Sequence, residues 1–376
     1  MSEPSWDQAR ELAREAAPTA ASDLTELVSA LGATAAVDLL ALAPMPHAPT
    51  SAMDGWAVAG KGPWRLESST GPLLAGTARV IVTGGVPPAG CTAVLQSEHG
   101  EVVDGVLVGP TPEPNRHIRP AGQEAKTGDV LVSTGKVLTP TDLALIANTG
   151  HDTVEVRHRP RIRLVVTGDE LLAAGLPVPG RVRDVMTPML PPVLTALGAT
   201  IESVVRVGDD AQLVADAAVG TGFDLLVSAG GTGRSTVDPI GQAWDLLGAD
   251  IRFRGVDMKP GHPVSLAVLA DRRPWLALPG NPLAAVLTAL SFVPALIAGH
   301  TGRPIPRPLE FTAGSDFVAR AGTTLIPATL TENGLVPAGP HRSNQLRGLA
   351  TADFVAVIGE GGVKAGERLR ALGRTW

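Results

Sequence analysis

A pattern of an apolar run, a glycine-containing turn and a helical segment recurs along residues 160–303. The apolar runs are RIRLVV, FDLLVSA and PWLAL, and the turns after them are Thr167–Asp169, Gly230–Gly233 and Pro279–Asn281. Strands that alternate with helices predict a parallel sheet with helices on both faces. Ligands bind such sheets at the carboxyl ends of the strands. We therefore expect the three turns to lie together at one edge, each leading into a helix.

The segments on either side of this pattern predict other structure. Residues 5–42 show Leu and Ala at three- and four-residue spacing after a capping serine, which predicts a helix. Residues 54–125 are short apolar runs separated by Gly and Pro, which is typical of a small all-β unit. TPTDLALIANTG (139–150) is predicted to be a helix capped by threonine and ended by glycine. After a linker near residue 303, short strands predict a small β-barrel or sandwich.

Composition excludes several classes of function. The chain has 376 residues, a net charge of −6, 3% aromatic residues and no long basic run, which argues against nucleic-acid binding. The single cysteine, Cys91, cannot form an internal disulfide, and this fits a reducing compartment. No apolar run approaches about 18 residues and the N-terminus is polar, so we expect no membrane insertion and a cytoplasmic location.

The second turn begins a glycine-rich loop, GGTGRSTVD (230–238), that ends in an acid. Backbone N–H groups in such a loop can cradle a phosphate or another oxyanion. The loop matches neither the phosphate loop G-x-x-x-x-G-K-[ST] nor the dinucleotide fingerprint G-x-G-x-x-G. A plain strand-to-helix turn is an equally good interpretation of the loop alone.

Charged residues at two other turns suggest a cation and an anion site. Asp169 and Glu170 follow a strand and could bind a divalent cation, although an acid there also favours a helix dipole. Lys259 and His262 flank a Pro-Gly turn in MKPGHP, and such a lysine suits an anionic ligand, although a solvated turn is the simpler reading. The eight histidines show no metal-ligand spacing, so no zinc site is expected.

Taken together, these segments resemble one family. SAMDGWAV, VIVTGGVPPAGCTAVLQSE, HIRPAGQE, VVTGDEL, SAGGTGRSTVD, MKPGHP and LPGNPLA occur in the order typical of the molybdopterin molybdotransferases, which include the C-terminal domain of gephyrin. The resemblance extends from about residue 5 to the C-terminus. It implies insertion of molybdate into adenylated molybdopterin, with release of AMP and the use of a divalent cation such as Mg²⁺.

The resemblance also implies an architecture. The expected chain is a multidomain α/β protein that forms elongated homodimers, with a site between the sheet domain of one subunit and the β-rich domain of the other. Four domains are expected: 1–50 with 126–155 as elongated helical domain I, 51–125 as β-rich domain II, 156–303 as molybdopterin-binding domain III, and 304–376 as C-terminal β domain IV. In this arrangement Asp54 of SAMDG would face the partner's sheet edge. Gly55 would let backbone come close to the ligand.

Site residues follow by matching motif positions. The residues that resemble catalytic ones are Asp54, Thr83, Glu170, Asp184 and Asp238, and the last three would hold the metal ion. Cleavage of a pyrophosphate bond requires charge neutralisation, which carboxylates achieve through a metal. The residues that resemble substrate-binding ones are Gly230, Gly231, Thr232, Gly233, Lys259, His262, Pro279, Gly280, Asn281, Arg320 and Ser343.

Several polar positions depart from the family pattern. His262 stands where a second lysine is usual, and Gly233 where a serine is usual. Val185 and Met186 replace polar residues, and Gln123 replaces an acid. Loss of polar contacts at a site often weakens transition-state stabilisation. Two alternatives to an active transferase therefore stay open: a catalytically impaired paralogue that binds molybdopterin or a protein partner as a scaffold, and an unrelated sugar- or nucleotide-binding enzyme.

Overall fold

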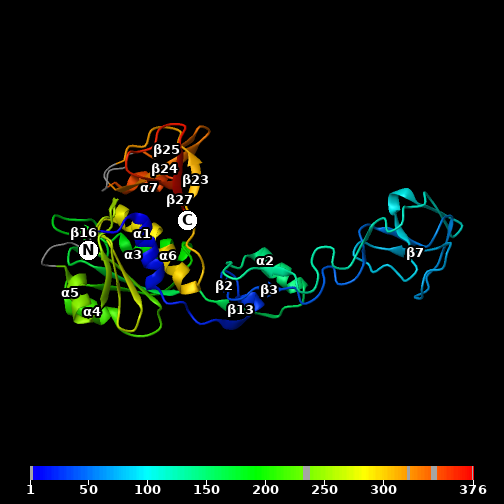
Figure 1. Cartoon of the computed structure of the whole chain (residues 1–376), viewed down its shortest axis with the longest axis horizontal. Coiled ribbons are helices and arrows are strands. Elements are labelled where there is room, and N and C mark those ends of the chain that lie inside the picture. The colour runs from blue at the N-terminus through cyan, green and yellow to red at the C-terminus, as the bar shows by residue number, and fades with distance from the viewer. Residues whose placement is uncertain (1–2, 232–237, 320–321, 340–344, 375) are drawn as a thin grey trace. The chain divides into compact units, whose positions relative to one another are not determined.

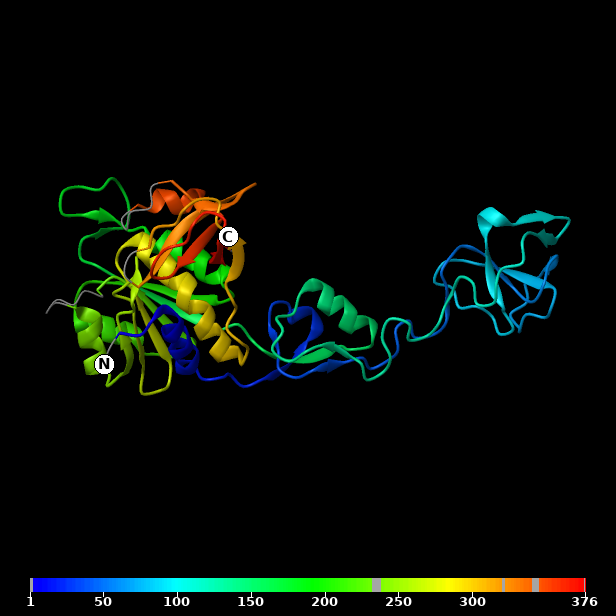
Figure 2. The ribbon, with the colours of Figure 1, turned by 45° about the horizontal axis from the view of Figure 1, so that its top comes forward.

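The computed structural model describes residues 3–231, 238–319, 322–339, 345–374 and 376. The chain forms two compact units (Figures 1 and 2). The first comprises residues 1–23, 32–34 and 157–376, and the second comprises residues 24–31 and 35–156. The finer division into four domains stays a prediction.

A six-stranded sheet forms the centre of the first unit. Its order is β17 (Thr200–Val207), β14 (Arg161–Thr167), β18 (Leu225–Ala229), β22 (Pro274–Leu278), β21 (Ser265–Val268) and β19 (Asp250–Arg254). The first four strands are parallel neighbours. Strand β21 is antiparallel to β22, and β19 is antiparallel to β21. The predicted parallel sheet is therefore confirmed for β14, β18 and β22, with an antiparallel extension at one side.

Helices cover both faces of this sheet, as predicted. The side chains of β14 alternate: Ile162, Leu164 and Val166 enter one core, and Val165 enters another. The first core also contains side chains of α1 (Trp6–Ala16), α3 (Met186–Ala196) and α6 (Pro282–Thr301). The second contains side chains of α4 (Ala211–Ala218) and α5 (Pro239–Leu246). Figure 1 shows α1, α3 and α6 grouped apart from α4 and α5.

Helix α6 corrects one expectation from the sequence. This helix has 20 residues with a mean hydropathy of 1.9 in its most apolar window, so by length and composition it could cross a membrane. The apolar run was missed because two prolines, Pro282 and Pro294, lie within it. In the structure 89% of that window is buried. The helix is the central element of the first core, where it packs against α1 and α3.

The N-terminal helix is much shorter than predicted. Ser5 caps α1 through a reciprocal capping box with Gln8, as its position suggested, but the helix ends at Ala16 rather than near residue 42. Pro18 explains this end, because a proline lacks an N–H and disfavours helical backbone in the residue before it. The chain continues as short elements: β1 (Asp23–Glu26), η1 (Leu27–Ser29), β2 (Thr34–Ala35) and β3 (Leu39–Leu40).

The predicted helix directly after Thr167 does not form in residues 168–185, all of which the structure describes. Instead β15 (Leu171–Leu172) pairs with β16 (Val182–Arg183), and α3 begins at Met186. Two glycines and two prolines between residues 175 and 180 prevent a continuous helix there.

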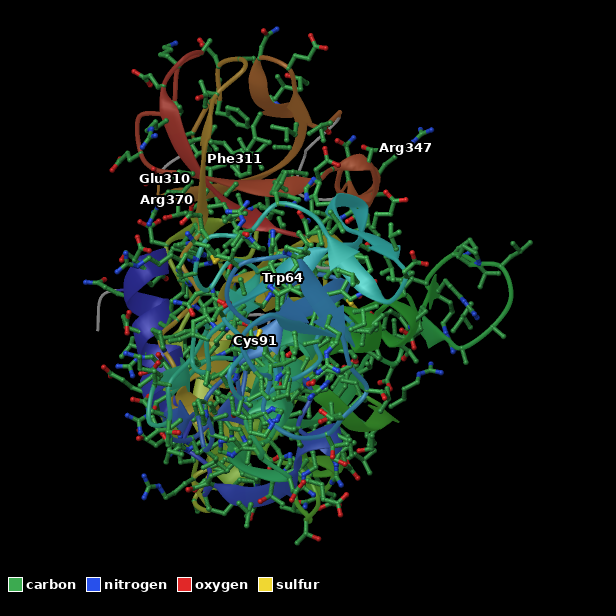
Figure 3. The ribbon with its side chains drawn as sticks, turned by 90° about the vertical axis from the view of Figure 1, so that its right-hand side faces the viewer. Trp64, Cys91, Glu310, Phe311, Arg347 and Arg370 are labelled. Carbon is green, nitrogen blue, oxygen red and sulfur yellow. The ribbon has the colours of Figure 1, made fainter. Side chains whose placement is uncertain are left out.

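The C-terminal part of the first unit is a small barrel. Its elements are β20 (Met258–Lys259), β23 (Leu309–Thr312), β24 (Thr323–Thr331), β25 (Gly334–Pro337), α7 (Leu346–Thr351), β26 (Phe354–Ile358) and β27 (Arg368–Gly373). Strands β25, β24, β26, β27 and β23 are neighbours in that order, and a bridge between Ala313 and Leu335 closes the ring. Phe311, labelled in Figure 3, packs against Phe354 with ring centroids 4.5 Å apart.

The second unit contains small sheets and one large sheet. Strand β13 (Thr153–Arg157) lies between β1 and β2, β12 (Val130–Val132) pairs with β3, and β11 (Ile118–Arg119) pairs with β4 (Thr50–Ser51). Helix α2 (Pro140–Asn148) is capped by Thr139, as predicted. This part of the unit therefore consists mainly of short strands rather than being helical.

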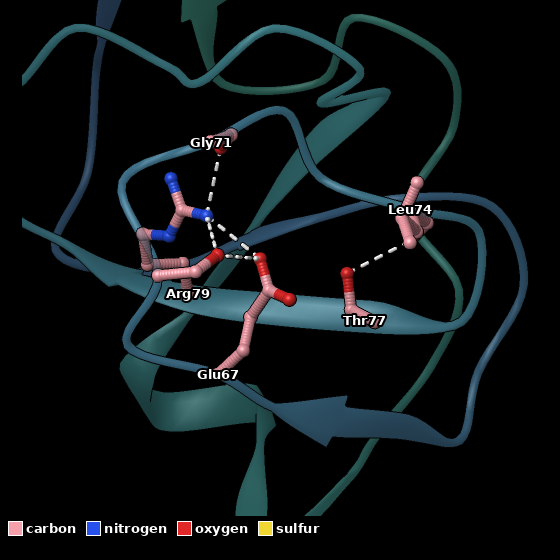
Figure 4. Close-up of polar contacts among 6 residues, drawn as sticks. Glu67, Gly71, Leu74, Thr77 and Arg79 are labelled. Carbon is pink, nitrogen blue, oxygen red and sulfur yellow. Dashed lines mark hydrogen bonds and ion pairs between the residues drawn. The ribbon is translucent and has the colours of Figure 1, made fainter.

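The large sheet confirms the predicted all-β unit. Its order is β8 (Ala93–Gln96), β5 (Gly55–Val58), β7 (Thr77–Ile81), β6 (Trp64–Leu66), β10 (Val106–Val108) and β9 (Glu101–Val103), and η2 (Ser97–His99) follows β8. Arg79 fixes the loop between β6 and β7: its Nη2 donates to Glu67, Ser69 and the carbonyl of Gly71 over 2.7–3.0 Å (Figure 4).

Candidate active site

The three glycine turns meet at one edge of the sheet, as predicted. Strands β14, β18 and β22 are parallel and end together, and the N–H of Gly230 donates to the carbonyl of Leu278 over 3.3 Å. A Cβ on Gly230 would lie 2.5 Å from the carbonyl oxygen of Thr167, and the φ of Gly230 is +101°. Glycine is therefore required where the first two turns touch.

Thr167 contributes a polar atom that the motifs did not single out. Its side chain is 3% exposed, and its Oγ1 has no hydrogen-bond partner within the described residues. A Cβ on Gly231 would lie 3.1 Å from this oxygen, so the hydroxyl lies directly beneath the second turn. Nothing in the sequence pattern signals this position, because a threonine at the end of a strand is ordinary.

Asp238 caps helix α5 at this edge. Its Oδ1 accepts hydrogen bonds from the N–H groups of Ile240 (3.1 Å) and Gly241 (3.2 Å). Burial raises the pKa of Asp238, and these two hydrogen bonds and the nearby Arg254 guanidinium only partly oppose the effect. No hydrogen bond to Oδ2 is formed from the described part of the chain, so this oxygen is available to a ligand.

The carboxylate of Asp184, which the resemblance assigns to the metal ion, already has several partners within the protein. Its Oδ1 accepts from the N–H groups of Met186 and Thr187, each at 3.0 Å. Its Oδ2 accepts from the Thr187 hydroxyl at 2.6 Å and lies 3.2 Å from Arg206 Nε. Burial disfavours the charged form, but the Thr187 hydrogen bonds and Arg206 outweigh it and lower the pKa of Asp184. These donors occupy the carboxylate, which anchors the start of α3.

Glu170 is exposed, and its carboxylate turns back toward Gly168: a Cβ there would lie 2.8 Å from Oε2. Asp169 beside it exchanges backbone-to-carboxylate hydrogen bonds with Asp209. Within the described ranges, no group of three or more His, Cys, Asp or Glu side chains is placed to hold a metal ion. The predicted set of Glu170, Asp184 and Asp238 thus has two acids with free oxygens, Glu170 and Asp238.

A cleft of about 620 Å³ lies beside this edge and is lined by four of the predicted substrate-binding residues. Its walls include His262, Pro279 and Asn281 from the sheet domain, and Lys259 of β20 and Leu325 of β24 from the barrel. Asn281 caps α6 through its Oδ1, which accepts from the N–H of Ala284 at 3.0 Å. Lys259 is exposed. The cleft therefore combines a cation with the positive end of a long helix, which favours an anion.

His262 faces an acid. Its Nε2 lies 2.9 Å from Glu3 Oε2, which comes from the segment before α1. Another departure from the family pattern, Met186, is buried in the first core, where an apolar side chain fits.

Asp54 and Thr83 come together in the second unit. The N–H of Thr83 donates to Asp54 Oδ1 over 2.6 Å, and both residues are exposed. The N–H and hydroxyl of Thr83 lower the pKa of Asp54. Gly55 also permits strand pairing, because a Cβ there would lie 2.0 Å from the carbonyl oxygen of Leu95; its predicted approach to a ligand stays a prediction.

Four predicted residues, Thr232, Gly233, Arg320 and Ser343, lie outside the described residues. The roles assigned to the others from motif positions stay predictions. The structure brings together the predicted sheet-edge residues in one unit, and Asp54 with Thr83 in the other.

Comparison with known proteins identifies the family. Residues 4–150 match the family model "MoeA N-terminal region (domain I and II)", and residues 163–298 match "Probable molybdopterin binding domain". The molybdopterin molybdenumtransferase of Synechococcus elongatus is 30% identical over 287 residues, covering 70% of this chain and 71% of the relative. Molybdopterin molybdenumtransferase 2 of Mycobacterium tuberculosis is 29% identical, covering 89% and 90%.

Solved structures support the same fold. The molybdopterin biosynthesis MoeA protein from Pyrococcus horikoshii superposes with a TM-score of 0.77 at 22% identity, covering 99% of each chain. The relatives do not favour the scaffold alternative or an unrelated sugar- or nucleotide-binding enzyme. The resemblance inferred from the motifs is therefore confirmed, and the chain belongs to the MoeA family of molybdopterin molybdenumtransferases.

Proposed function

We propose that this protein is a molybdopterin molybdenumtransferase of molybdenum cofactor biosynthesis, which inserts molybdate into adenylated molybdopterin and releases AMP. The similarity to molybdenumtransferases along most of the chain carries this proposal. The geometry supports it, because the glycine turns and the cleft with Lys259 offer adjoining places for a phosphate and an oxyanion.

The residues of the sheet edge would bind and orient the substrates. The turn at Gly230 and Gly231 has no side chains, so a phosphate can approach the backbone closely. Lys259 and the N-terminus of α6 at Asn281 would hold molybdate through charge and dipole. The Thr167 hydroxyl lies beneath the same turn.

A divalent cation such as Mg²⁺ fits two of the three acids first considered. Magnesium commonly binds one or two carboxylates and completes its shell with substrate phosphates and water. Glu170 and Asp238 have oxygens available for this, whereas Asp184 does not. When bound, the ion would neutralise charge on the pyrophosphate that is cleaved.

We also propose that the site is completed by a second copy of the chain in a cytoplasmic homodimer. Asp54 and Thr83 are exposed in one unit, while the sheet-edge residues belong to the other. An exposed, hydrogen-bonded aspartate on a rigid sheet is suited to contact a ligand held elsewhere. Asp54 of one protomer would then face the sheet edge of its partner.

A defined reaction tests the function. Purified protein is incubated with adenylated molybdopterin and Mg²⁺, with and without molybdate, while AMP release and active cofactor are measured. We expect molybdate-dependent AMP release. Tight pterin binding without release would refute the proposed activity.

The shared site has its own test. Asp54→Asn and Lys259→Gln proteins are each expected to lose turnover, and mixing them should restore part of it, because mixed dimers carry one intact site. A shared site would be ruled out if the unaltered protein sedimented as a monomer. It would also be ruled out if turnover did not recover in mixed dimers that are shown to have exchanged subunits.

A further inference from the structure

A second, wide cavity lies away from the sheet edge. It is a groove of about 1120 Å³ along α1 and the segment 302–308, and it reaches Arg370 of the barrel. Figure 1 shows α1 beside α6, whose C-terminal end leads into this segment. None of the predicted catalytic or substrate-binding residues that the structure describes lines this groove.

Some charges in the groove are paired. Asp7 accepts two hydrogen bonds from Arg370, at 3.2 and 3.1 Å, and Glu11 pairs with Arg14 at 3.2 Å. Glu3 lies 2.9 Å from His262. These contacts account for three of the four acids that line the groove, and leave Glu15.

Three guanidinium groups remain without a carboxylate. The guanidinium group of Arg303 makes no hydrogen bond or ion pair with any residue of the described chain, although its backbone N–H donates to the carbonyl of Ala298, and its Nε is sealed from solvent without an acceptor. Arg10 is 7% exposed; its Nη2 donates to the carbonyl of Pro306, but its Nε also lacks an acceptor. Arg307 lines the same groove and forms no ion pair with a described acid.

This arrangement leaves positive charge uncompensated where water is partly excluded. Five arginines and four acids line the groove, and His262, which faces Glu3, lies outside it, so the lining has one more positive than negative side chain. Burial lowers the pKa of Arg303, and no nearby acid offsets it. A buried cation without an acceptor is costly, and an oxyanion that binds the exposed Nη atoms would relieve that cost.

We propose that this groove is a second ligand site, distinct from the active site, that binds the phosphate of a phosphate ester through Arg303 and Arg10. A phosphate group is opposite in sign to the excess charge of the groove, and planar guanidinium groups bind phosphate oxygens in pairs. The groove is far larger than one phosphate and is lined by Leu12, Ile305 and four prolines, which leaves room for an apolar ester group.

Inorganic phosphate serves as the probe. The full-length protein is titrated with phosphate at constant pH and ionic strength, with chloride as the exchanged ion, and binding is followed by calorimetry and by the melting temperature. We expect saturable binding, which separates a site from the general effect of phosphate on stability. Arg303→Gln should weaken this binding about tenfold or more, since a charge-assisted contact is lost.

Two variants separate the groove from other cations. Arg14→Gln removes a groove arginine that already has a partner, and should leave phosphate affinity unchanged. Lys259→Gln removes the cation of the active-site cleft, and should also retain the groove binding. Arg303→Gln is expected to melt no lower than the unaltered protein in chloride, because an uncompensated charge has been removed.

The opposite results overturn the proposal. These are an absence of saturable phosphate binding, binding that is lost in Lys259→Gln but kept in Arg303→Gln, or equal weakening by Arg14→Gln and Arg303→Gln. The proposed transferase activity is independent of all three, because its own test is molybdate-dependent AMP release.

Discussion

The backbone N–H of Thr83 donates a hydrogen bond to Oδ1 of Asp54 over 2.6 Å, and this contact fixes an exposed carboxylate at the start of a strand. Residues distant in the sequence are joined because β5 and β7 are antiparallel neighbours. The N–H and then the hydroxyl of Thr83 lower the pKa of Asp54, so the charged form is favoured. This fixed carboxylate is the feature on which the proposed shared site depends.

Asp54→Asn is expected to reduce molybdate-dependent AMP release about 100-fold or more, because a positioned carboxylate at a reacting centre commonly contributes that much. The fold should be retained, since the side chain is exposed. Asp38 provides a matched control: it is exposed and accepts hydrogen bonds from the N–H (2.7 Å) and hydroxyl (2.9 Å) of Thr134 in the same way. Asp38→Asn should leave the rate unchanged, and equal losses in both variants would contradict a catalytic role.

Thr167→Val is expected to raise stability while weakening substrate binding. The buried hydroxyl has no partner among the described residues, so replacing it with a methyl group of similar shape should stabilise the protein by about 1 kcal/mol. Substrate would lose a hydrogen bond from the sheet edge, raising KM. Urea unfolding and steady-state kinetics measure the two effects.

Thr301→Val is the comparison for that experiment. The Thr301 hydroxyl is buried but donates to the carbonyl of Ile297 over 2.7 Å at the far end of α6. This variant should not gain stability and should keep the normal KM. A destabilised Thr167→Val protein with unchanged KM would show that its hydroxyl is merely structural.

The sheet edge could be predicted from local patterns because parallel strands end together. The turns at Thr167, Gly230 and Pro279 each follow an apolar run, and right-handed crossovers bring such ends to one side. The cleft containing Lys259 and Asn281 follows from the same rule. The closeness of Asp54 and Thr83 depends on strand pairing within one small sheet, and motif resemblance alone suggested it.

Other features depend on contacts that local patterns do not encode. The engagement of Asp184 requires Arg206, which lies on β17, a strand that was not among the three recognised ones. Apolar spacing continues past Pro18, so the spacing alone predicts a longer helix, whereas the proline ends α1 at Ala16. Arg10 and Arg303 line one groove although they lie far apart in the sequence, as the hydrogen bond from Arg10 to the carbonyl of Pro306, 296 positions away, also shows.

Asp184→Ala is expected to destabilise the protein by about 3 kcal/mol at neutral pH. Two backbone N–H groups, the Thr187 hydroxyl and Arg206 would lose their acceptor in a buried place. Because the folded-state pKa of Asp184 is lowered, its contribution is present above the unfolded pKa of about 3.9 and is lost as the pH falls through the folded pKa. Urea unfolding at several pH values should show the variant and the unaltered protein converging in acid. A variant of normal stability that has lost its response to Mg²⁺ would instead support a metal-binding role.

Asp238 combines a helix cap with a carboxylate at the site, and two substitutions separate these roles. Asn is as good a cap as Asp, whereas Asp238→Ala should lose about 1 kcal/mol of stability with the cap. Because the folded-state pKa of Asp238 is raised, its stabilising contribution is present below the unfolded pKa of about 3.9 and is lost as the pH rises through the folded pKa. Asp238→Asn should therefore gain stability relative to the unaltered protein as the pH rises from about 4, and then reach a plateau.

If Asp238 also holds the cation, this more stable protein should still lose Mg²⁺-dependent AMP release. Full activity in Asp238→Asn would mean that the acid serves only as a cap, and Glu170 would then be the predicted metal ligand to test next.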